Sequence, residues 1–272
     1  ELASISLYAL SGFLKDKKSS EASLKYLLLG AMSSAILLYG MALVFGTTGE
    51  TQLDKIYAAV QGMALGNISA NPALVVGVVL LIAGFGFKIA AFPFHMWVPD
   101  VYEGAPTPVV AYLSVGSKAA GFAVILRVFY SSFGGSDWLM SNWGSIIAIL
   151  AATGMFLGNL TALPQTNIKR MLGYSSIAQA GYLMVGLAAL GAAPFAPVLS
   201  ESGVLFFLTG YALANLGAFA AIIAISNKIG SDEINDFSGM FKRAPVLTLA
   251  LSLSLISLIG MPPAAGFIAK FY

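Results

Sequence analysis

The sequence contains no cysteine and a single histidine, and only 10% of its 272 residues are charged. Without cysteine the chain can form no disulfide, and it cannot bind an iron–sulfur cluster or a zinc ion through thiolates. One histidine is too few for a pair of haem ligands or a histidine-rich metal site. No nucleotide-binding loop of the GxGxxG or GxxxxGK[ST] type occurs either. We therefore expect this chain to bind no metal and no redox cofactor itself.

Apolar residues, by contrast, make up 58% of the chain, against roughly 45–50% in a typical soluble domain. The run LLLGAMSSAILLYGMALVFG (27–46) carries no charge and is long enough for one helix to cross a hydrocarbon core of about 30 Å. Open strands are excluded from lipid and the runs lack the alternation of barrel strands, so we predict an all-α polytopic membrane protein. About eight transmembrane segments are expected, near 1–14, 25–46, 73–92, 108–131, 143–163, 171–191, 203–227 and 245–272.

The connections between these segments are short, which favours one transmembrane domain over residues 1–272. The odd-numbered connections carry nine basic residues, namely Lys15, Lys17, Lys18, Lys25, Lys169, Arg170, Lys228, Lys242 and Arg243, against Lys55 and Arg127 elsewhere. Cytoplasmic loops are enriched in Lys and Arg, so we predict that the odd-numbered connections face the cytoplasm. The chain lacks an initial Met and stops within an apolar run, so we expect it to be part of a longer chain.

Three lysines, Lys88, Lys118 and Lys270, lie within apolar segments. A lysine at the bilayer centre costs about 2.5–3.5 kcal/mol on insertion scales, which is a large fraction of the roughly 5–15 kcal/mol stability of a domain. Each lysine could instead extend to an interface or sit in a purely structural ion pair. Lys118 is too far from either end of its segment to reach an interface easily, so we interpret the three together as functional.

Two of these lysines lie beside helix breakers. Pro93, Pro99, Pro106 and Pro108 follow Lys88, and Gly260, Pro262, Pro263 and Gly266 precede Lys270. Proline removes a backbone donor, and a broken helix persists in a membrane only where water or protein satisfies the freed carbonyls. The two regions share AGFxxK, at 83–88 and 265–270. Interrupted segments in corresponding positions of two halves are typical of inverted-repeat transporters, so we predict half-repeats of about 1–131 and 143–272.

A buried lysine whose carboxylate partner can approach or withdraw is a proton site of switchable affinity, because burial favours the neutral amine and a nearby carboxylate favours the charged form. Glu1 is the expected partner of Lys88. His95 could relay protons or could be a structural hydrogen-bonding residue. Asp100 and Glu103 are expected to cap and turn their connection, and Asp232, Glu233 and Asp236 to be solvated surface.

The run FKIAAFPFHMWVPDVYEGAPTPVVAYLSVGSK (87–118) resembles the antiporter-like membrane subunits of respiratory complex I, the NADH:quinone oxidoreductase. PDVYEGAPTPV is more similar to subunit N (subunit 2 in organelles) than to L or M. The resemblance extends to NIKRMLGYSSIAQAGYLMVGL and GMPPAAGFIAKFY, as in the central block of a roughly fourteen-helix subunit. It assigns Glu1, Lys88, Lys118 and Lys270 to proton transfer. Where the family often has histidine this chain has Gln179, so a relay there would need water.

The resemblance also implies the activity, cofactors, partners and location of the chain. It implies proton pumping driven by quinone reduction elsewhere in the complex, with NADH, FMN, iron–sulfur clusters and quinone bound by other subunits. The implied partners are other membrane subunits of complex I, neighbouring antiporter-like subunits among them, and lipid, with no nucleic acid. The implied location is a bacterial cytoplasmic membrane, or an organelle inner or thylakoid membrane. The alternatives are a subunit of a multisubunit cation/proton antiporter or membrane-bound hydrogenase, and a stand-alone secondary transporter.

Overall fold

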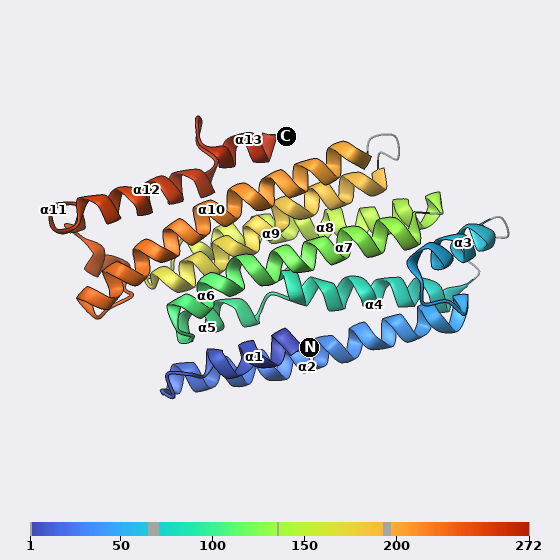
Figure 1. The fold of residues 1–272 in the computed structure, drawn as a ribbon, viewed down its shortest axis with the longest axis horizontal. Helices are drawn as coiled ribbons and strands as arrows, with labels where there is room; N and C mark the ends of the chain where they lie inside the picture. The colour runs from blue at the N-terminus through green and yellow to red at the C-terminus, as the bar shows by residue number, and fades with distance from the viewer. Residues whose placement is uncertain (1, 65–70, 135, 193–196, 272) are drawn as a thin grey trace.

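The computed structural model describes residues 2–64, 71–134, 136–192 and 197–271 (Figure 1). Within these ranges the chain is helical, and its one extended pairing is an antiparallel bridge between Asn167 and Glu233. The all-α prediction is therefore confirmed for this part of the chain. The main helices are α1 (Leu2–Ser11), α2 (Lys17–Thr48), α3 (Leu53–Ala64), α4 (Pro72–Ile89), α5 (Trp97–Gly104), α6 (Thr107–Tyr112), α7 (Lys118–Phe133), α8 (Asp137–Ala162), α9 (Ile168–Ala192), α10 (Pro197–Ile229), α11 (Met240–Arg243), α12 (Pro245–Ile259) and α13 (Ala265–Phe271).

Five described helical stretches are long and apolar enough to span a membrane: Lys17–Thr48, Pro72–Ile89, Thr107–Phe133, Asp137–Ala162 and Glu201–Ile229. The helices α1 and α12 are apolar but shorter. Large apolar side chains lie on the outer surface, for example Leu38 (63% exposed) on α2, Phe156 (66%) on α8 and Leu213 (72%) on α10. Such a surface suits lipid rather than water, so the bundle is that of an integral membrane protein.

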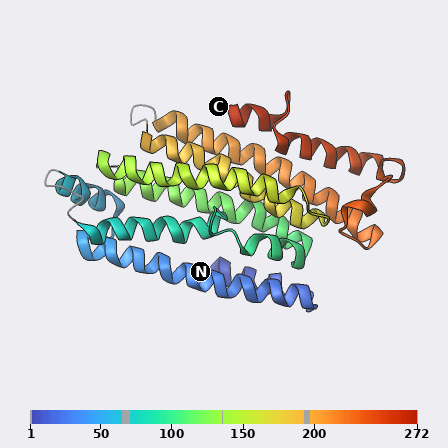
Figure 2. The same ribbon diagram turned by 180° about the vertical axis from the view of Figure 1, so that it is seen from behind.

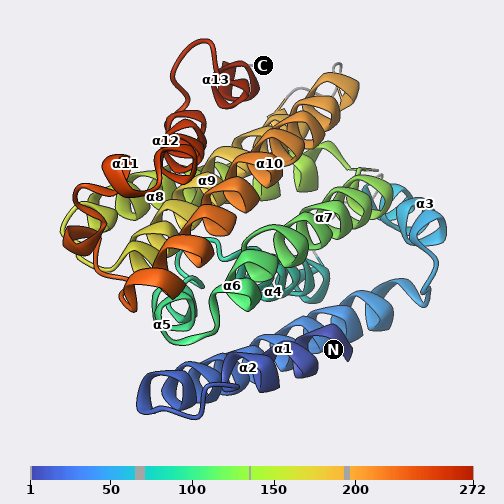
Figure 3. The ribbon, with the colours of Figure 1, turned by 60° about the vertical axis from the view of Figure 1, so that its left-hand side comes forward.

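The helices lie side by side with their axes roughly aligned, and their order across the bundle positions the lysines. Helices α1 and α2 form one edge and α12 and α13 the other, as the views from the front and from behind agree (Figures 1 and 2). Between them lie α4 to α10, with α8 and α9 packed closely together (Figure 3). The short helix α5 contacts both α2 and α9, so it connects these two helices at one end of the bundle.

Helices α4 and α12 end in the same way. Each is followed by a residue in the left-handed conformation, Ala90 (φ 59°) after α4 and Gly260 (φ 84°) after α12. The next amide then reaches back five residues, from Ala91 to the Gly86 carbonyl (2.8 Å) and from Met261 to the Ile256 carbonyl (3.2 Å). These bonds are typical of a Schellman ending, which closes a helix by satisfying its last carbonyls internally. The chain is then non-helical until α5 begins at Trp97 and α13 at Ala265.

Three helical features depart from the sequence prediction. The connection expected at 47–72 contains α3, and the punctuation expected at 93–107 contains α5. Both helices were missed because they are short and carry polar residues, so neither forms a long apolar run. Between α6 and α7 the helix continues through a π-helical turn at Leu113–Ser117, immediately before Lys118.

Candidate functional site

Lys118 lies in the interior of the bundle, at the first residue of α7. Its side chain is buried (2% of the residue exposed). The amine contacts the backbone carbonyl of Ser176 on α9 and donates to the Ser176 hydroxyl (Nζ to Oγ, 2.5 Å). No carboxylate of the described residues lies within ion-pair distance of this amine. Among the described residues the polar contacts of the amine are therefore a hydroxyl and a carbonyl rather than a counter-charge.

A cluster of buried hydroxyl and amide groups surrounds Ser176. Its Oγ lies 3.1 Å from the Tyr102 hydroxyl on α5 and accepts a hydrogen bond from the Tyr211 hydroxyl on α10 (3.2 Å). Asn215 Nδ2 donates to the Tyr211 hydroxyl (3.2 Å) and to Ser114 Oγ (2.6 Å) in the π-helical turn. We call Lys118, Ser176, Tyr102, Tyr211, Asn215 and Ser114 the Lys118 cluster. It joins α5, the π-helical turn with the start of α7, α9 and α10.

Sequence reasoning identified Lys118 but missed the other five members of this cluster. A π-helical turn, a feature frequent at functional sites, directly precedes the lysine, but it became visible only in the structure. Nothing in the sequence marks Ser176, Tyr211 or Asn215 as neighbours of Lys118, because Ser176 lies 58 residues from it.

Lys270 lies on α13, beside the end of α12. Its amine donates to the carbonyls of Leu258 (2.8 Å) and Ile259 (3.1 Å). In a continuous helix these carbonyls would accept from residues four positions later, which are Pro262 and Pro263 and carry no N–H. The lysine amine thus supplies donors to the two carbonyls that the prolines leave free.

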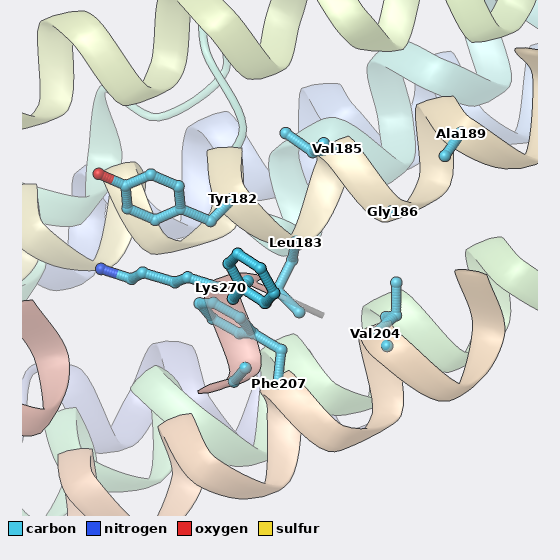
Figure 4. Close-up of a pocket in the computed structure, with 11 residues that line it drawn as sticks. Tyr182, Leu183, Val185, Gly186, Ala189, Val204, Phe207 and Lys270 are labelled. Atoms are coloured by element: carbon cyan, nitrogen blue, oxygen red, sulfur yellow. The ribbon is translucent and has the colours of Figure 1, made fainter. Parts of the chain in front are cut away.

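Gln179 and Tyr182 on α9 complete the surroundings of Lys270. Gln179 is buried, and its Nε2 donates to the same Leu258 carbonyl (2.8 Å). The Lys270 amine lies 4.3 Å from the centre of the Tyr182 ring, a cation–π distance. Figure 4 shows the lysine side chain extending beside this ring, at a groove of about 320 Å³ between α9, α10 and α13.

The Lys118 cluster and the surroundings of Lys270 meet along α9. Ser176, Gln179 and Tyr182 follow one another at intervals of three residues, which places them on one face of the helix. A cavity of about 10 Å³, roughly the volume that one water molecule needs, is lined by Tyr211, Gln179, Leu258 and Lys270. The structure therefore brings Lys118, Gln179 and Lys270 to one region of the bundle.

Lys88 and His95 lie at the end of α4. Lys88 occupies the last turn of the helix, and its amine donates to the Ser4 hydroxyl on α1 (2.8 Å). Its predicted partner Glu1 lies outside the described residues. His95 lies in the segment between α4 and α5, stacked on Phe92 with ring centres 5.3 Å apart. Its Nδ1 is buried and has no hydrogen-bond partner among the described residues.

Asp100 and Glu103 lie in α5 and hold it in an ion-pair network, which corrects the expectation that they cap a turn. Arg170 of α9 contacts both carboxylates (2.7 and 3.0 Å), Lys25 pairs with Asp100 (2.6 Å) and Lys18 pairs with Glu103 (2.7 Å). Burial alone would raise the pKa of each carboxyl. The hydrogen bonds from Lys25 and Arg170 nevertheless lower the pKa of Asp100 below its usual value, and those from Lys18 and Arg170 do the same for Glu103.

Asp232 also departs from the expected solvated surface. Its carboxylate accepts from Lys169 (2.8 Å), whose side chain is only 7% exposed. The Ile168 amide donates to the Asp232 carbonyl (2.9 Å), so the loop after α10 is fixed to the start of α9. This buried lysine is thus paired with a carboxylate, whereas Lys118 contacts none among the described residues. Among the described residues no group of three or more His, Asp or Glu side chains could hold a metal ion.

Comparison with known proteins places this arrangement in a family. The family model for "NADH:quinone oxidoreductase/Mrp antiporter, TM" matches residues 1–272. The NADH-quinone oxidoreductase subunit N of Dehalococcoides mccartyi is 52% identical over 275 residues, which cover 100% of this chain and 56% of that protein. The chain thus spans about half the length of the curated relatives it matches.

Two solved structures have the same fold. A chain of the archaeal membrane-bound sulfane sulfur reductase superposes with a TM-score of 0.85 at 30% identity, over 98% of this chain and 52% of that one. A chain of respiratory complex I from Thermus thermophilus with bound aureothin gives a TM-score of 0.79 at 37% identity, over 98% of this chain and 54% of that one. Since the family model covers the whole sequence, the chain belongs to the NADH:quinone oxidoreductase/Mrp antiporter transmembrane family.

Proposed function

We propose that this chain is a redox-inactive, proton-translocating part of subunit N of an NADH:quinone oxidoreductase. The observation that carries the proposal is the buried amine of Lys118, solvated by hydroxyl and carbonyl groups with no carboxylate of the described residues in ion-pair contact. Burial favours the neutral form of an intramembrane amine and hydrogen-bond acceptors favour its charged form, so an amine in a polar cluster can gain and lose a proton. Identity of 52% with a subunit N supports the assignment to this complex.

In this proposal protons enter from the cytoplasm toward Lys88, pass Lys118 and leave by Lys270, and Glu1 acts as the movable partner of Lys88. The face of α9 that carries Ser176, Gln179 and Tyr182 supports the second step, because it contacts both Lys118 and the carbonyl bound by Lys270. Gln179 does not titrate near neutrality, so transfer past it uses water, for which the 10 Å³ cavity beside it has room. His95 is a structural residue here rather than a relay.

The proposal includes an architecture of eight spans, two of them interrupted. One interrupted span would consist of α4 followed by α5 at its cytoplasmic end, and the other of α12 followed by α13. The matching Schellman endings after Ile89 and Ile259 support this pairing, as does the AGFxxK sequence shared by the two regions. Residues 1–131 and 143–272 would then be the two inverted half-repeats.

We propose that the chain works within a multisubunit membrane complex. The partners would be the other membrane subunits of the complex, with neighbouring antiporter-like subunits among them. NADH, FMN, iron–sulfur clusters and quinone would be bound by other subunits, and the complex would lie in a bacterial cytoplasmic membrane. The bacterial subunit N relatives support this location.

The test is substitution of Lys118 by alanine in the intact complex, reconstituted in proteoliposomes. Quinone reduction and proton uptake are measured together, with a pH-sensitive dye reporting the protons moved per electron. We expect Lys118→Ala to lower this ratio while the complex still assembles, because the buried amine is removed and no described carboxylate is left unpaired. Lys228→Ala is the matched control, since Lys228 is an exposed lysine at the end of α10. An unchanged ratio in Lys118→Ala would exclude this role for the residue.

A second candidate is the same proton-carrying role in a different membrane complex of this family. It is favoured by the TM-score of 0.85 with the sulfane sulfur reductase chain, which exceeds the 0.79 for the complex I chain. Sequence identity points the other way, at 30% against 37%. Purification of the complex with its native partners separates the two, because only an NADH:quinone oxidoreductase oxidises NADH with quinone as acceptor.

A further inference from the structure

The hydrogen bonds of the Lys118 cluster have a direction that can be traced from one end. Asn215 Nδ2 uses its two hydrogens on Ser114 Oγ and on the Tyr211 hydroxyl. Tyr211 accepts from Asn215, so its own hydrogen is available for Ser176 Oγ, to which it donates. One lone pair of Ser176 Oγ is therefore occupied by Tyr211. The hydroxyl keeps one lone pair and one hydrogen for Lys118 and Tyr102.

The charge of Lys118 determines whether the remaining lone pair of Ser176 Oγ faces Lys118 or Tyr102, and which of the two receives its hydrogen. An ammonium has three N–H donors and no acceptor, so Ser176 must accept from it and direct its own hydrogen to Tyr102. A neutral amine has a lone pair, so Ser176 can donate to it and accept from Tyr102 instead. Either the Tyr102 or the Ser176 hydroxyl can be the donor at their separation of 3.1 Å. Rotation of two hydroxyl groups is then enough to match both states.

We propose that Ser176 is a positioning residue for Lys118, whose hydroxyl turns from acceptor to donor when the amine loses a proton, while Tyr102 changes in the opposite sense. Ser176 keeps its own proton throughout, so it transfers none and lies outside the proton path. Its role is to keep one donor and one acceptor facing each other in both states of the amine. This inference rests on the proposed function, because it takes Lys118 to be the group that changes charge.

The titratable and charged groups near Lys118 are consistent with this role of Ser176. The titratable side chains within the cluster are Tyr102 from α5 and Tyr211 from α10, both buried. Helix α4 packs closely against α7, since an added Cβ on Gly121 would lie 2.7 Å from Ile89 Cγ2. The titratable residue on this part of α4 is Lys88, whose amine donates to the Ser4 hydroxyl. The face of α9 toward Lys118 contributes the neutral Ser176, and α3 has Asp54, Lys55 and Tyr57 near the other end of α7. In the described residues no carboxylate contacts the amine, so its polar contacts are the hydroxyl and the backbone carbonyl of Ser176.

The test is the pH profile of proton pumping in the intact reconstituted complex. Ser176→Ala removes the hydroxyl but keeps the backbone carbonyl that Lys118 also contacts. The lost bond is stronger to an ammonium than to an amine, so we expect the midpoint of the profile to move to lower pH by about one unit, a tenfold change in proton affinity. Ser176→Thr keeps a hydroxyl and should restore the original midpoint. Ser145→Ala is the matched control, since among the described residues that hydroxyl donates to the Ser141 carbonyl of its own helix and to no group of the Lys118 cluster.

Tyr102→Phe provides a second measurement that does not depend on assembly of Ser176→Ala. It removes the group that exchanges roles with Ser176 and keeps the buried ring, so the midpoint should move in the same direction by a smaller amount. A Ser176→Ala profile that superimposes on the original, or a Thr variant that behaves like the Ala variant, would overturn the inference. So would an unchanged profile in Tyr102→Phe. If Lys118→Ala pumps normally, the proposed function fails as well; if it does not, only the role of Ser176 is excluded.

Discussion

At the scale of single residues, the position of Lys270 depends on a glycine. An added Cβ on Gly266 would overlap the Ser257 carbonyl oxygen, so α13 can lie against the end of α12 only with glycine there. We expect Gly266→Ala to push α13 away and to cost about 1–3 kcal/mol, as overpacking of a close contact does. The thermal unfolding midpoint of the purified complex, measured with its proton-to-electron ratio, checks this.

Gly210→Ala on α10 is the matched control for Gly266→Ala. A Cβ there would lie 3.9 Å from Ala265 Cβ, an ordinary van der Waals contact with the same short helix. Equal unfolding midpoints for the two variants would show that the approach of α13 to α12 is not constrained as described.

Residue chemistry also explains which parts of the site the sequence could predict. A lysine in an apolar run is visible because its insertion cost is large, and this identified Lys88, Lys118 and Lys270. Ser176, Tyr211 and Asn215 are ordinary residues of apolar helices until the fold brings them together, and the Ser176–Tyr211 pair spans 35 residues. Tertiary packing likewise determines that Lys169 pairs with Asp232 while Lys118 contacts no carboxylate of the described residues.

At the scale of elements, α5 is held by ion pairs that an acid titration can test. The pKa values of Asp100 and Glu103 are lowered in the folded state from 3.8 and 4.5, so their contribution to stability is complete above those values. It is lost as the pH falls through the lower folded values. We expect the unfolding midpoint of the complex to change little through these groups between pH 7 and pH 5 and to fall below about pH 4.

Arg170→Gln separates this network from other acid-sensitive groups. It removes the cation that contacts both carboxylates. The free energy of unfolding at pH 7 should therefore be lower by about 1 kcal/mol, as expected for partly exposed pairs, and the acid-induced loss of stability should be smaller. Lys242→Gln is the control, because it removes an exposed cation of α11 that contacts neither carboxylate. An acid-induced loss in Arg170→Gln as large as in the unmodified protein would assign that loss to other groups.

The elements that the sequence did not predict, α3 and α5, have a common reason. A span is predictable from its length and uniform apolarity, since lipid surrounds it whatever its neighbours are. A helix of eight residues such as α5 has too few backbone hydrogen bonds to be stable alone, and it forms because α2 and α9 hold it by contacts distant in sequence.

At the scale of the whole molecule, the topology predicted from Lys and Arg can be tested directly. The chain has no cysteine, so single cysteines can be introduced without a background from this segment. We expect Lys17→Cys and Lys228→Cys to react with a membrane-impermeant maleimide from the cytoplasmic side, and Thr51→Cys from the opposite side. All three positions are exposed in the described structure. Comparison of inside-out and right-side-out vesicles gives the result, and labelling of positions 17 and 51 from the same side would refute the predicted orientation.

The end of α12 has a property that follows from simple counting of hydrogens. Two carbonyls there lack peptide donors, and the Lys270 amine fills both. A charged amine has one hydrogen more than these two positions need, and the spare one is free for the face of Tyr182. Deprotonation takes away only that surplus, so the Leu258 and Ile259 carbonyls can keep their donors whether the side chain is charged or neutral.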